Sequence, residues 1–363
     1  MDFGIPKQKR PFDYRVGMTS MGVEVLTRLG HRVYVEHDAG QGSGFEDERY
    51  RQAGAQIVYS SEELYGRGQM ILTVSRPTEQ EFGLLREGHI LCGFLHLAVA
   101  HPARLETLLK RKVTAVAYET IQTTDGRLPV LAAASQIAGR MIAPIASQLL
   151  QNNEGGHGIL LGGVPGVPAA RVVILGAGIV GVNAARMFSA LGADVTLLDV
   201  DLARLQALED HGYRLRTMVA YDFNVAKAVR AADVVVGSVL IPGARTPVVV
   251  TREMVRSMKP RSVIMDVSID QGGCVETSHP TTYQAPTYIE EGVIHYCVPN
   301  MTGVLARTTT HALNNAFWPF IREIADKGLT AALEADAALR LGIHTHNGEI
   351  VHPVLREAVG GGR

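Results

Sequence analysis

The sequence predicts an α/β fold of two domains, each built on a parallel sheet. The chain has 363 residues, a length typical of about two domains. Short apolar runs alternate along it with amphipathic stretches, which is the pattern of strands that alternate with helices. The runs are apolar at consecutive positions, as in strands that helices cover on both faces. A hydrophobic share of 46% and a charged share of 20% exclude a disordered or fibrous chain.

The apolar runs divide between the two domains. The first part of the chain has expected strands at 33–35, 70–74, 90–94 and 113–116. A long helix over 131–152 leads to strands at 172–175, 195–198, 234–239, 263–266 and 294–298. Tail helices at 310–324 and 329–341 have no strands of their own to cover, so we expect them to pack back on the first domain. The expected organisation is a first domain of residues 1–130 plus 308–363, with a second domain of residues 131–307 inserted between its two parts.

Composition excludes several kinds of partner. Lys+Arg number 35 against 36 Asp+Glu, so the chain has no basic excess to bind nucleic acid or an anionic membrane. The most apolar stretch, 131–150, contains Arg140 and is interpreted as a buried helix rather than a membrane span. The N-terminal segment lacks the apolar core of a secretory signal, and three scattered cysteines fit neither a disulfide scaffold nor a CxxC metal site. We therefore expect a cytoplasmic protein.

The strongest motif is a glycine-rich turn between a strand and a helix. An apolar strand runs into the sequence GAGIVG, and the residues expected to face a dinucleotide are Gly176, Gly178, Ile179, Val180 and Gly181. Asp199 follows at the end of the next strand, close to the ~20-residue spacing of this motif. This context favours a Rossmann dinucleotide site over a plain glycine turn with a strand-end carboxylate. Asp199 would accept hydrogen bonds from ribose hydroxyls and repel a 2′-phosphate, which favours NAD over NADP, while Arg204 is expected to be solvated.

Further motifs follow one another along almost the whole chain. They are GIPK at 4–7, RV at 15–16, GSGF at 42–45, FLHL at 94–97, AYET at 117–120, GGVPGV at 162–167, GAGIVG at 176–181, SIDQGGC at 268–274 and NM at 300–301. Together they resemble the alanine dehydrogenase family, whose cofactor domain is shared with proton-translocating nicotinamide transhydrogenases. The resemblance implies two Rossmann-like domains, a substrate domain and an inserted NAD-binding domain, in a homo-oligomer that is usually a hexamer.

The resemblance also implies roles for individual residues. Arg15 would grip the substrate carboxylate, a task suited to a planar guanidinium, unless it is a surface arginine. His96 would move protons at the reacting carbon, although a lone strand-end histidine is more often structural. Asp270 would assist proton transfer, and we favour it for this role over Asp266, which is interpreted as a carboxylate at the end of a strand. The further cofactor contacts implied are Ser135 near the pyrophosphate, Val239 and Leu240 at the ribose, and Met301 close to the nicotinamide.

The implied reaction is oxidative deamination of a small L-amino acid, with L-alanine as the default. Hydride would leave Cα for the nicotinamide, and water would attack the iminium to release ammonia and a 2-oxo acid. Positioning and exclusion of water, rather than covalent catalysis, would lower the barrier.

Four departures from the family pattern gather around the expected pocket. Ser75 stands where the family carries a lysine that meets the substrate, and whether the neighbouring Arg76 replaces it is left open, because adjacent strand residues face opposite sides. Both prolines of the family are missing from 302–306, so this segment is expected to be a freer or differently shaped loop. Gln8 and Gln136 stand in place of glutamates.

These departures leave two alternatives beside the alanine enzyme. One is a repurposed homologue that acts on another amino acid or reductively couples a 2-oxo acid to an amino-acid amine. The other is a regulator that binds NAD(H) without catalysis, which the retention of Arg15, His96 and Asp270 disfavours. No metal site is expected, and the histidines at 344, 346 and 352 are interpreted as part of a polar C-terminal loop.

Overall fold

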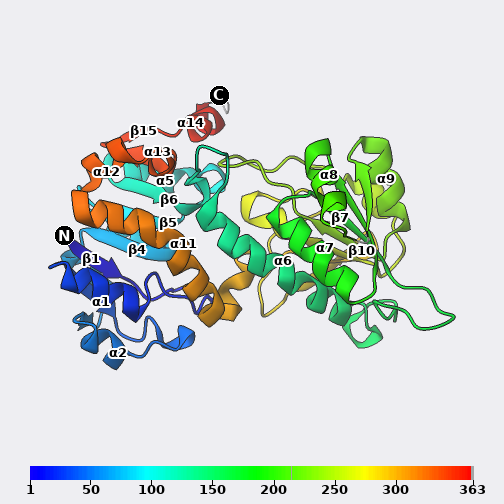
Figure 1. Cartoon of the computed structure of the whole chain (residues 1–363), viewed down its shortest axis with the longest axis horizontal. Helices are drawn as coiled ribbons and strands as arrows, with labels where there is room; N and C mark the ends of the chain where they lie inside the picture. Colours follow the sequence, from blue (N-terminus) through cyan, green and yellow to red (C-terminus); the bar gives the residue numbers. More distant parts are fainter. Residues whose placement is uncertain (214, 361–363) are drawn as a thin grey trace. The chain divides into compact units, whose positions relative to one another are not determined.

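The computed structural model describes residues 1–213 and 215–360, which divide into two compact units. Unit 1 contains Met1–Ala134, Pro242–Ala244 and the described residues from Thr302 onward, and unit 2 contains Ser135–Ile241 and Arg245–Met301. Each unit has its own mostly parallel sheet with helices around it (Figure 1). The predicted α/β fold class is confirmed.

The sheet of unit 1 has eight strands among the described residues, in the order β15-β14-β6-β5-β4-β1-β2-β3. The strands are β1 (Asp2–Ile5), β2 (Arg32–Glu36), β3 (Gln56–Val58), β4 (Met70–Ser75), β5 (Ile90–Phe94), β6 (Thr114–Ala117), β14 (Ile343–His346) and β15 (Glu349–Ile350). The pairs from β3 across to β6 are parallel, and β14 joins β6 antiparallel. The carboxyl ends of the parallel strands therefore share one edge, where ligands of such sheets bind.

The helices of unit 1 cover both faces of this sheet. They are α1 (Ser20–Arg28), α2 (Asp47–Gln52), α3 (Ser61–Arg67), α4 (Glu79–Leu84), α5 (Pro102–Lys110), α11 (Ala306–Lys327), α12 (Leu329–Ala335), α13 (Ala337–Leu341) and α14 (Pro353–Gly360). Neighbouring strand residues such as Met70 and Ile71 are buried in different clusters, one on each side of the sheet. This burial on both faces explains why β4 and β5 are apolar at almost every position.

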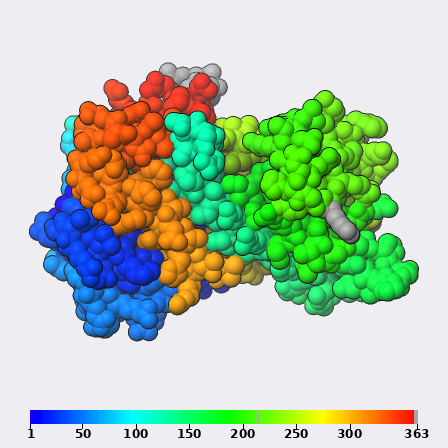
Figure 2. Space-filling view, in the orientation of Figure 1, coloured from blue at the N-terminus to red at the C-terminus, as the bar shows by residue number. Residues whose placement is uncertain are grey.

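The tail helices pack on the N-terminal part of the chain. Leu313, Phe317 and Ile321 of α11 are buried in the same cluster as Phe3 and Val33. Figures 1 and 2 show α11, in orange, beside the blue N-terminal segment, and Thr19 before α1 donates through its amide to Asn314 of α11 at 3.2 Å. Unit 1 thus holds segments from both ends of the sequence.

Two elements of unit 1 differ from the sequence-based expectation. Residues 343–350 form the hairpin of β14 and β15 rather than a polar loop, and His344 is only 1% exposed. The segment carries few apolar residues, so its polarity disguises a strand whose hydrogen bonds come from β6. Residues 301–305 form a short 3-10 helix, η6 (Met301–Leu305), rather than a freer loop, and Ala306 begins α11.

Unit 2 has a seven-stranded sheet among its described residues, in the order β12-β13-β11-β10-β7-β8-β9. Its strands are β7 (Arg171–Leu175), β8 (Asp194–Asp199), β9 (Arg216–Val219), β10 (Val234–Gly237), β11 (Val263–Asp266), β12 (Thr287–Glu290) and β13 (Val293–Tyr296). Its helices include α7 (Ile179–Ala190), α8 (Leu202–Asp210), α9 (Asp222–Ala231) and α10 (Arg252–Arg256). All pairs are parallel except β12 with β13.

Helix α6 (Pro129–Leu149) links the two units in sequence. It is the one helix of the described residues that is long and apolar enough to cross a membrane by length and composition. Its Ile142, Ala143 and Ala146 are buried in the core of unit 2, which is an ordinary place for such a helix in a globular domain.

Candidate functional site

The glycine-rich turn joins β7 to α7, and its three glycines meet different surroundings. Gly176 has φ of 104°, a left-handed conformation, and a Cβ there would lie 2.7 Å from the carbonyl oxygen of Ser238. At Gly181 a Cβ would lie 1.9 Å from the Gly176 oxygen, so only glycine lets α7 pack this close to the turn. At Gly178 a Cβ would meet nothing within 4 Å. The turn is therefore tight on its protein side and open where a phosphate would approach.

Asp199 lies beside this turn at the end of β8 and is 6% exposed. Its carboxylate accepts hydrogen bonds from the amides of Ala177 at 2.6 Å and Asp201 at 2.8 Å. Arg204 lies within 3.8 Å of the same carboxylate, although its side chain is 57% exposed. The structure thus brings together the glycines and the acid that the sequence spacing indicated.

The other expected cofactor residues also lie in unit 2. Ile179 and Val180 form the first turn of α7, and a Cβ on Gly139 of α6 would lie 2.5 Å from the Val180 oxygen. Ser135 precedes Gly139 by one helical turn, on the same face of α6. The remaining three residues are Val239 and Leu240, which follow β10, and Met301, which begins η6.

A buried carboxylate organises the segment that carries Asp270. Asp266, at the end of β11, is 2% exposed and accepts hydrogen bonds from the amides of Ser268, Cys274 and Val275 at 3.1, 2.9 and 3.1 Å. Burial raises the pKa of Asp266 above its usual value. Asp270 lies in η5 (Val267–Gln271) and accepts from the amide of Asn300 at 3.0 Å. Asp266 thus fixes three amides of its own segment, whereas Asp270 bonds to the amide of one remote residue, Asn300.

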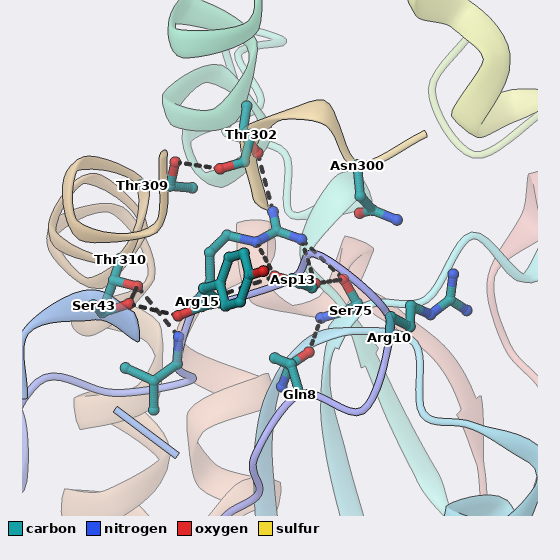
Figure 3. Close-up of polar contacts among 12 residues, drawn as sticks. Gln8, Arg10, Asp13, Arg15, Ser43, Ser75, Asn300, Thr302, Thr309 and Thr310 are labelled. Carbon is teal, nitrogen blue, oxygen red and sulfur yellow. Dashed lines mark hydrogen bonds and ion pairs between the residues drawn. The ribbon is translucent and has the colours of Figure 1, made fainter. Parts of the chain in front are cut away.

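In unit 1, Arg15 is buried against an acid that sequence reasoning missed. Its guanidinium donates to both carboxylate oxygens of Asp13, at 2.7 Å each, and to the hydroxyl of Thr302 at 3.1 Å (Figure 3). Ser75 accepts from Arg15 at 2.9 Å and donates to Asp13 at 2.6 Å. Arg15 and Ser75 are each 2% exposed and Asp13 is 7% exposed. We call these four residues the Arg15 cluster.

The electrostatics of the Arg15 cluster favour an ionised acid. Burial, the largest single influence, opposes ionisation of Asp13, but the charge of Arg15 and the hydrogen bonds from Arg15 and Ser75 outweigh it. The pKa of Asp13 is therefore lowered. The ion pair of Arg15 and Asp13, whose net formal charge is near zero, lies beside Ser75 at the carboxyl end of β4.

Further polar contacts hold the Arg15 cluster in place. Gln8 accepts from the amide of Ser75 at 2.9 Å, so this departure from the family pattern fixes another. Thr310 of α11 accepts from the amide of Val16 at 3.2 Å and shares a hydrogen bond with Ser43, while the Thr309 hydroxyl donates to the Thr302 oxygen (Figure 3). Three of the substituted positions, Gln8, Ser75 and Thr302, therefore lie together in one network.

His96 follows β5 in a left-handed conformation, with φ 44° and ψ 49°. The amides of Leu95 and His96 donate to the carboxylate of Glu119, at 3.2 and 2.6 Å. Arg76 donates through Nη1 to the carbonyls of Leu95 and His96, at 3.3 Å each. The guanidinium of Arg76 thus bonds to the backbone of His96, whereas its neighbour Ser75 belongs to the Arg15 cluster.

Sequence reasoning missed Asp13, Glu119 and Thr302 as members of the site. Asp13 stands two residues before Arg15, and Glu119 belongs to the AYET motif, so both had a local signal. Thr302 had none, because it reaches Arg15 from the far end of the chain.

The fold and the glycine turn with its strand-end acid define a dinucleotide-binding α/β protein of two units. The N-terminal domain model of the family described as alanine dehydrogenase/PNT matches residues 4–138, and its C-terminal domain model matches residues 143–353. The chain therefore belongs to the alanine dehydrogenase/PNT family, and the resemblance found in the sequence is confirmed.

Individual relatives agree over nearly full length. The chain is 47% identical to an alanine dehydrogenase of Methanococcus maripaludis over 99% of this chain and 96% of the relative. It is 46% identical to an alanine dehydrogenase of Bacillus subtilis over 99% and 95%. Among solved structures, an L-alanine dehydrogenase superposes with a TM-score of 0.90 at 42% identity over 99% of both chains. A transhydrogenase from Sinorhizobium meliloti gives a TM-score of 0.78 at 25% identity, over 97% of this chain and 100% of that one.

Proposed function

We propose that the protein is an NAD-dependent L-alanine dehydrogenase. The reaction converts L-alanine, NAD⁺ and water into pyruvate, ammonium, NADH and a proton. The observation that carries the proposal is the full-length likeness to alanine dehydrogenases at 42–47% identity. That likeness does not favour a reductive coupling enzyme or a non-catalytic regulator, because all these relatives carry the same name.

The residues of unit 2 fit NAD as the cofactor. The open side of the turn at Gly178 and the amides of Ile179 and Val180 suit a pyrophosphate, and Asp199 suits the ribose hydroxyls. When bound, the nicotinamide ring supplies the hydride acceptor. We assign Gly176 and Gly181 to the shape of the turn, and the further contacts to Ser135, Val239, Leu240 and Met301.

The residues of unit 1 fit a small amino acid. Arg15 binds the substrate carboxylate, and Asp13 holds its guanidinium in one orientation. Ser75 supplies a hydroxyl in place of an ammonium, so it helps to orient Arg15 through a hydrogen bond but adds no positive charge. His96 accepts and returns the protons of the amine and water steps, and we assign to Asp270 a supporting role in proton transfer.

Domain roles, location and assembly complete the proposal. Residues 1–130 plus 308–363 form the substrate domain, and residues 131–307 form the NAD-binding domain. The three cysteines, Cys92, Cys274 and Cys297, are free and buried, which fits the reducing cytoplasm. By resemblance the protein is a homohexamer, and light scattering that gives a single-subunit mass would refute this.

The test is the absorbance of NADH with purified protein, NAD⁺ and a panel of L-amino acids. The reverse reaction uses 2-oxo acids with ammonium, or with amino acids as amine donors. We expect L-alanine to be the best substrate, and pyruvate with ammonium to be the best pair in reverse. Turnover confined to another amino acid, or to a 2-oxo acid with an amino-acid donor, would overturn the proposal.

A further inference from the structure

The peptide units on either side of His96 are held from two directions by charged side chains. The carboxylate of Glu119 accepts the amides of Leu95 and His96, at 3.2 and 2.6 Å. The Nη1 atom of Arg76 donates to the carbonyls of the same two residues, at 3.3 Å each. All four backbone polar groups of this dipeptide therefore bond to ionisable side chains, one anion and one cation.

The backbone that these two side chains hold is strained. His96 has φ of 44°, in the left-handed region that few non-glycine residues adopt, although asparagine, aspartate and histidine are enriched there. Such a conformation persists only where the surroundings over-determine it, and it gathers at functional positions. If the four hydrogen bonds were lost, His96 would relax toward an ordinary conformation and its imidazole would point elsewhere.

The ring of His96 has little else to orient it. Catalytic histidines are commonly fixed by a hydrogen bond at the second ring nitrogen. Here Nδ1 of His96 is buried, and the described residues offer it no hydrogen-bond partner. The ring lies near-parallel to Phe94 with centroids 6.2 Å apart, a contact that a ring flipped by half a turn about its Cβ–Cγ bond would make equally well. Its orientation must therefore come mainly from its own backbone.

The chemistry of the two side chains suits this task. Glu119 is 2% exposed, so its carboxylate needs nearby donors, and two amides supply them. The arginine faces the carbonyl side of the same dipeptide, so each residue bonds the groups that the other cannot. Charge-assisted hydrogen bonds are stronger than neutral ones, and a set of four restricts the three consecutive peptide units that carry these groups.

We propose that Arg76 and Glu119 are positioning residues that lock the backbone of His96 and thereby aim its imidazole for proton transfer. The inference rests on the proposed function, in which His96 moves protons. It gives Arg76 a role distinct from that of the missing lysine, because its guanidinium serves the histidine rather than the substrate carboxylate.

The kinetic test compares Arg76→Gln and Glu119→Gln with Arg111→Gln. Arg111 also donates to backbone carbonyls, those of Phe82 at 3.2 Å and Gly83 at 2.6 Å, in a segment without proposed site residues. We expect each of the first two variants to lower kcat for L-alanine by about 10- to 100-fold, with KM and NADH affinity within about threefold. Arg111→Gln keeps kcat. A rise in KM at unchanged kcat for Arg76→Gln would make Arg76 a substrate ligand and overturn the proposal.

A double-mutant cycle tests whether the effect passes through His96. On a His96→Ala background, measured at high enzyme concentration, we expect Arg76→Gln to change the residual rate less than about twofold. The same 10- to 100-fold loss on that background would show that Arg76 acts independently of the histidine, which contradicts the proposal. If Glu119→Gln fails to fold, the cycle with Arg76 remains decisive, because Arg76 is only partly buried.

Hydrogen exchange separates this inference from the proposed function. We expect the amides of Leu95 and His96 to be protected in the wild type and to exchange at least tenfold faster in Glu119→Gln, while the rest of unit 1 is unchanged. Unchanged protection would overturn the inference even if L-alanine is turned over. Wild-type protein that shows this protection but does not oxidise L-alanine would instead overturn the proposed function.

Discussion

The cofactor edge of unit 2 and the Arg15 cluster of unit 1 are built in opposite ways. The turn and Asp199 come from one stretch of chain, and the bond between Ala177 and Asp199 spans 22 positions. The bond between Arg15 and Thr302 spans 287 positions. A site made from one continuous segment keeps its motif intact. A site assembled from remote segments can exchange a residue such as Ser75 if its partners adjust.

The largest expected effect tests the assembled site. Asp13→Asn leaves a buried guanidinium without its counter-charge, so the free energy of unfolding should fall by about 3–5 kcal/mol. Urea unfolding followed by the fluorescence of Trp318, the single tryptophan, measures this because it lies in α11 of unit 1.

The matched control is Asp125→Asn. Asp125 and Arg127 repeat the spacing of Asp13 and Arg15, but their side chains are 51% and 81% exposed. Because this pair is exposed, Asp125→Asn should leave the free energy of unfolding nearly unchanged. Equal losses in the two variants would mean that burial of the Arg15 cluster contributes nothing.

The second prediction tests the continuous site. Gly181→Ala places a Cβ 1.9 Å from the Gly176 oxygen, so we expect about 2–3 kcal/mol of destabilisation together with weaker NADH binding. Gly178→Ala meets no atom within 4 Å and should keep wild-type stability, yet lose NADH affinity at the open face of the turn. Thermal unfolding and NADH fluorescence titration separate the two effects. Equal stability of the two variants would contradict the assigned roles of these glycines.

The third prediction concerns acid, to which the two units should respond differently. Burial, followed by the nearby His352 and His96, lowers the pKa of His344 to about 3. The folded-state pKa lies below the unfolded value of 6.5, so stability is full above pH 6.5 and falls as the unfolded chain takes up a proton. The expected loss is about 2 kcal/mol between pH 6.5 and 5.

Unit 2 has a histidine whose pKa burial lowers, His295, but it also has a buried group of opposite sign, Asp266. The pKa of Asp266 is raised by burial, so a fall in pH through its folded-state pKa relieves the penalty of its buried charge. As the pH is lowered, unit 1 should therefore unfold first. The midpoint of the change in Trp318 fluorescence should lie at a higher pH than the midpoint of the loss of helix measured by circular dichroism. His344→Asn should remove most of this difference, and an unchanged acid midpoint would contradict the assignment.

The smallest effect belongs to the substituted residue itself. Ser75→Ala removes one acceptor of Arg15 and one donor to Asp13. We expect substrate binding to weaken by about 1 kcal/mol, which is a roughly fivefold rise in KM for L-alanine. Ser61→Ala is the control, because its hydroxyl also donates to a buried carboxylate, that of Glu36 at 3.1 Å. A wild-type KM in Ser75→Ala would mean that the hydroxyl does not orient Arg15.

Sequence reasoning succeeded where the signal is local. The apolar strands and the glycine turn were predicted because burial on both faces and a phosphate-binding turn each leave a continuous pattern. The edge strands β9 and β12 were not predicted, because one side of such a strand pairs with nothing and its residues are more polar. Strand β14 lies between β6 and β15 and was missed because most of its residues are polar. Thr302 was missed as a partner of Arg15, since that contact depends on how remote segments pack, whereas Asp13 stands two residues before Arg15 and had a local signal.

The most direct test of the central claim is the stoichiometry of products from L-alanine. Purified wild-type protein with NAD⁺ and L-alanine should form NADH, pyruvate and ammonium in equal amounts, and Arg15→Lys should lower kcat/KM at least tenfold without weakening NADH binding. Protein that binds NADH but forms no pyruvate from L-alanine would contradict the account.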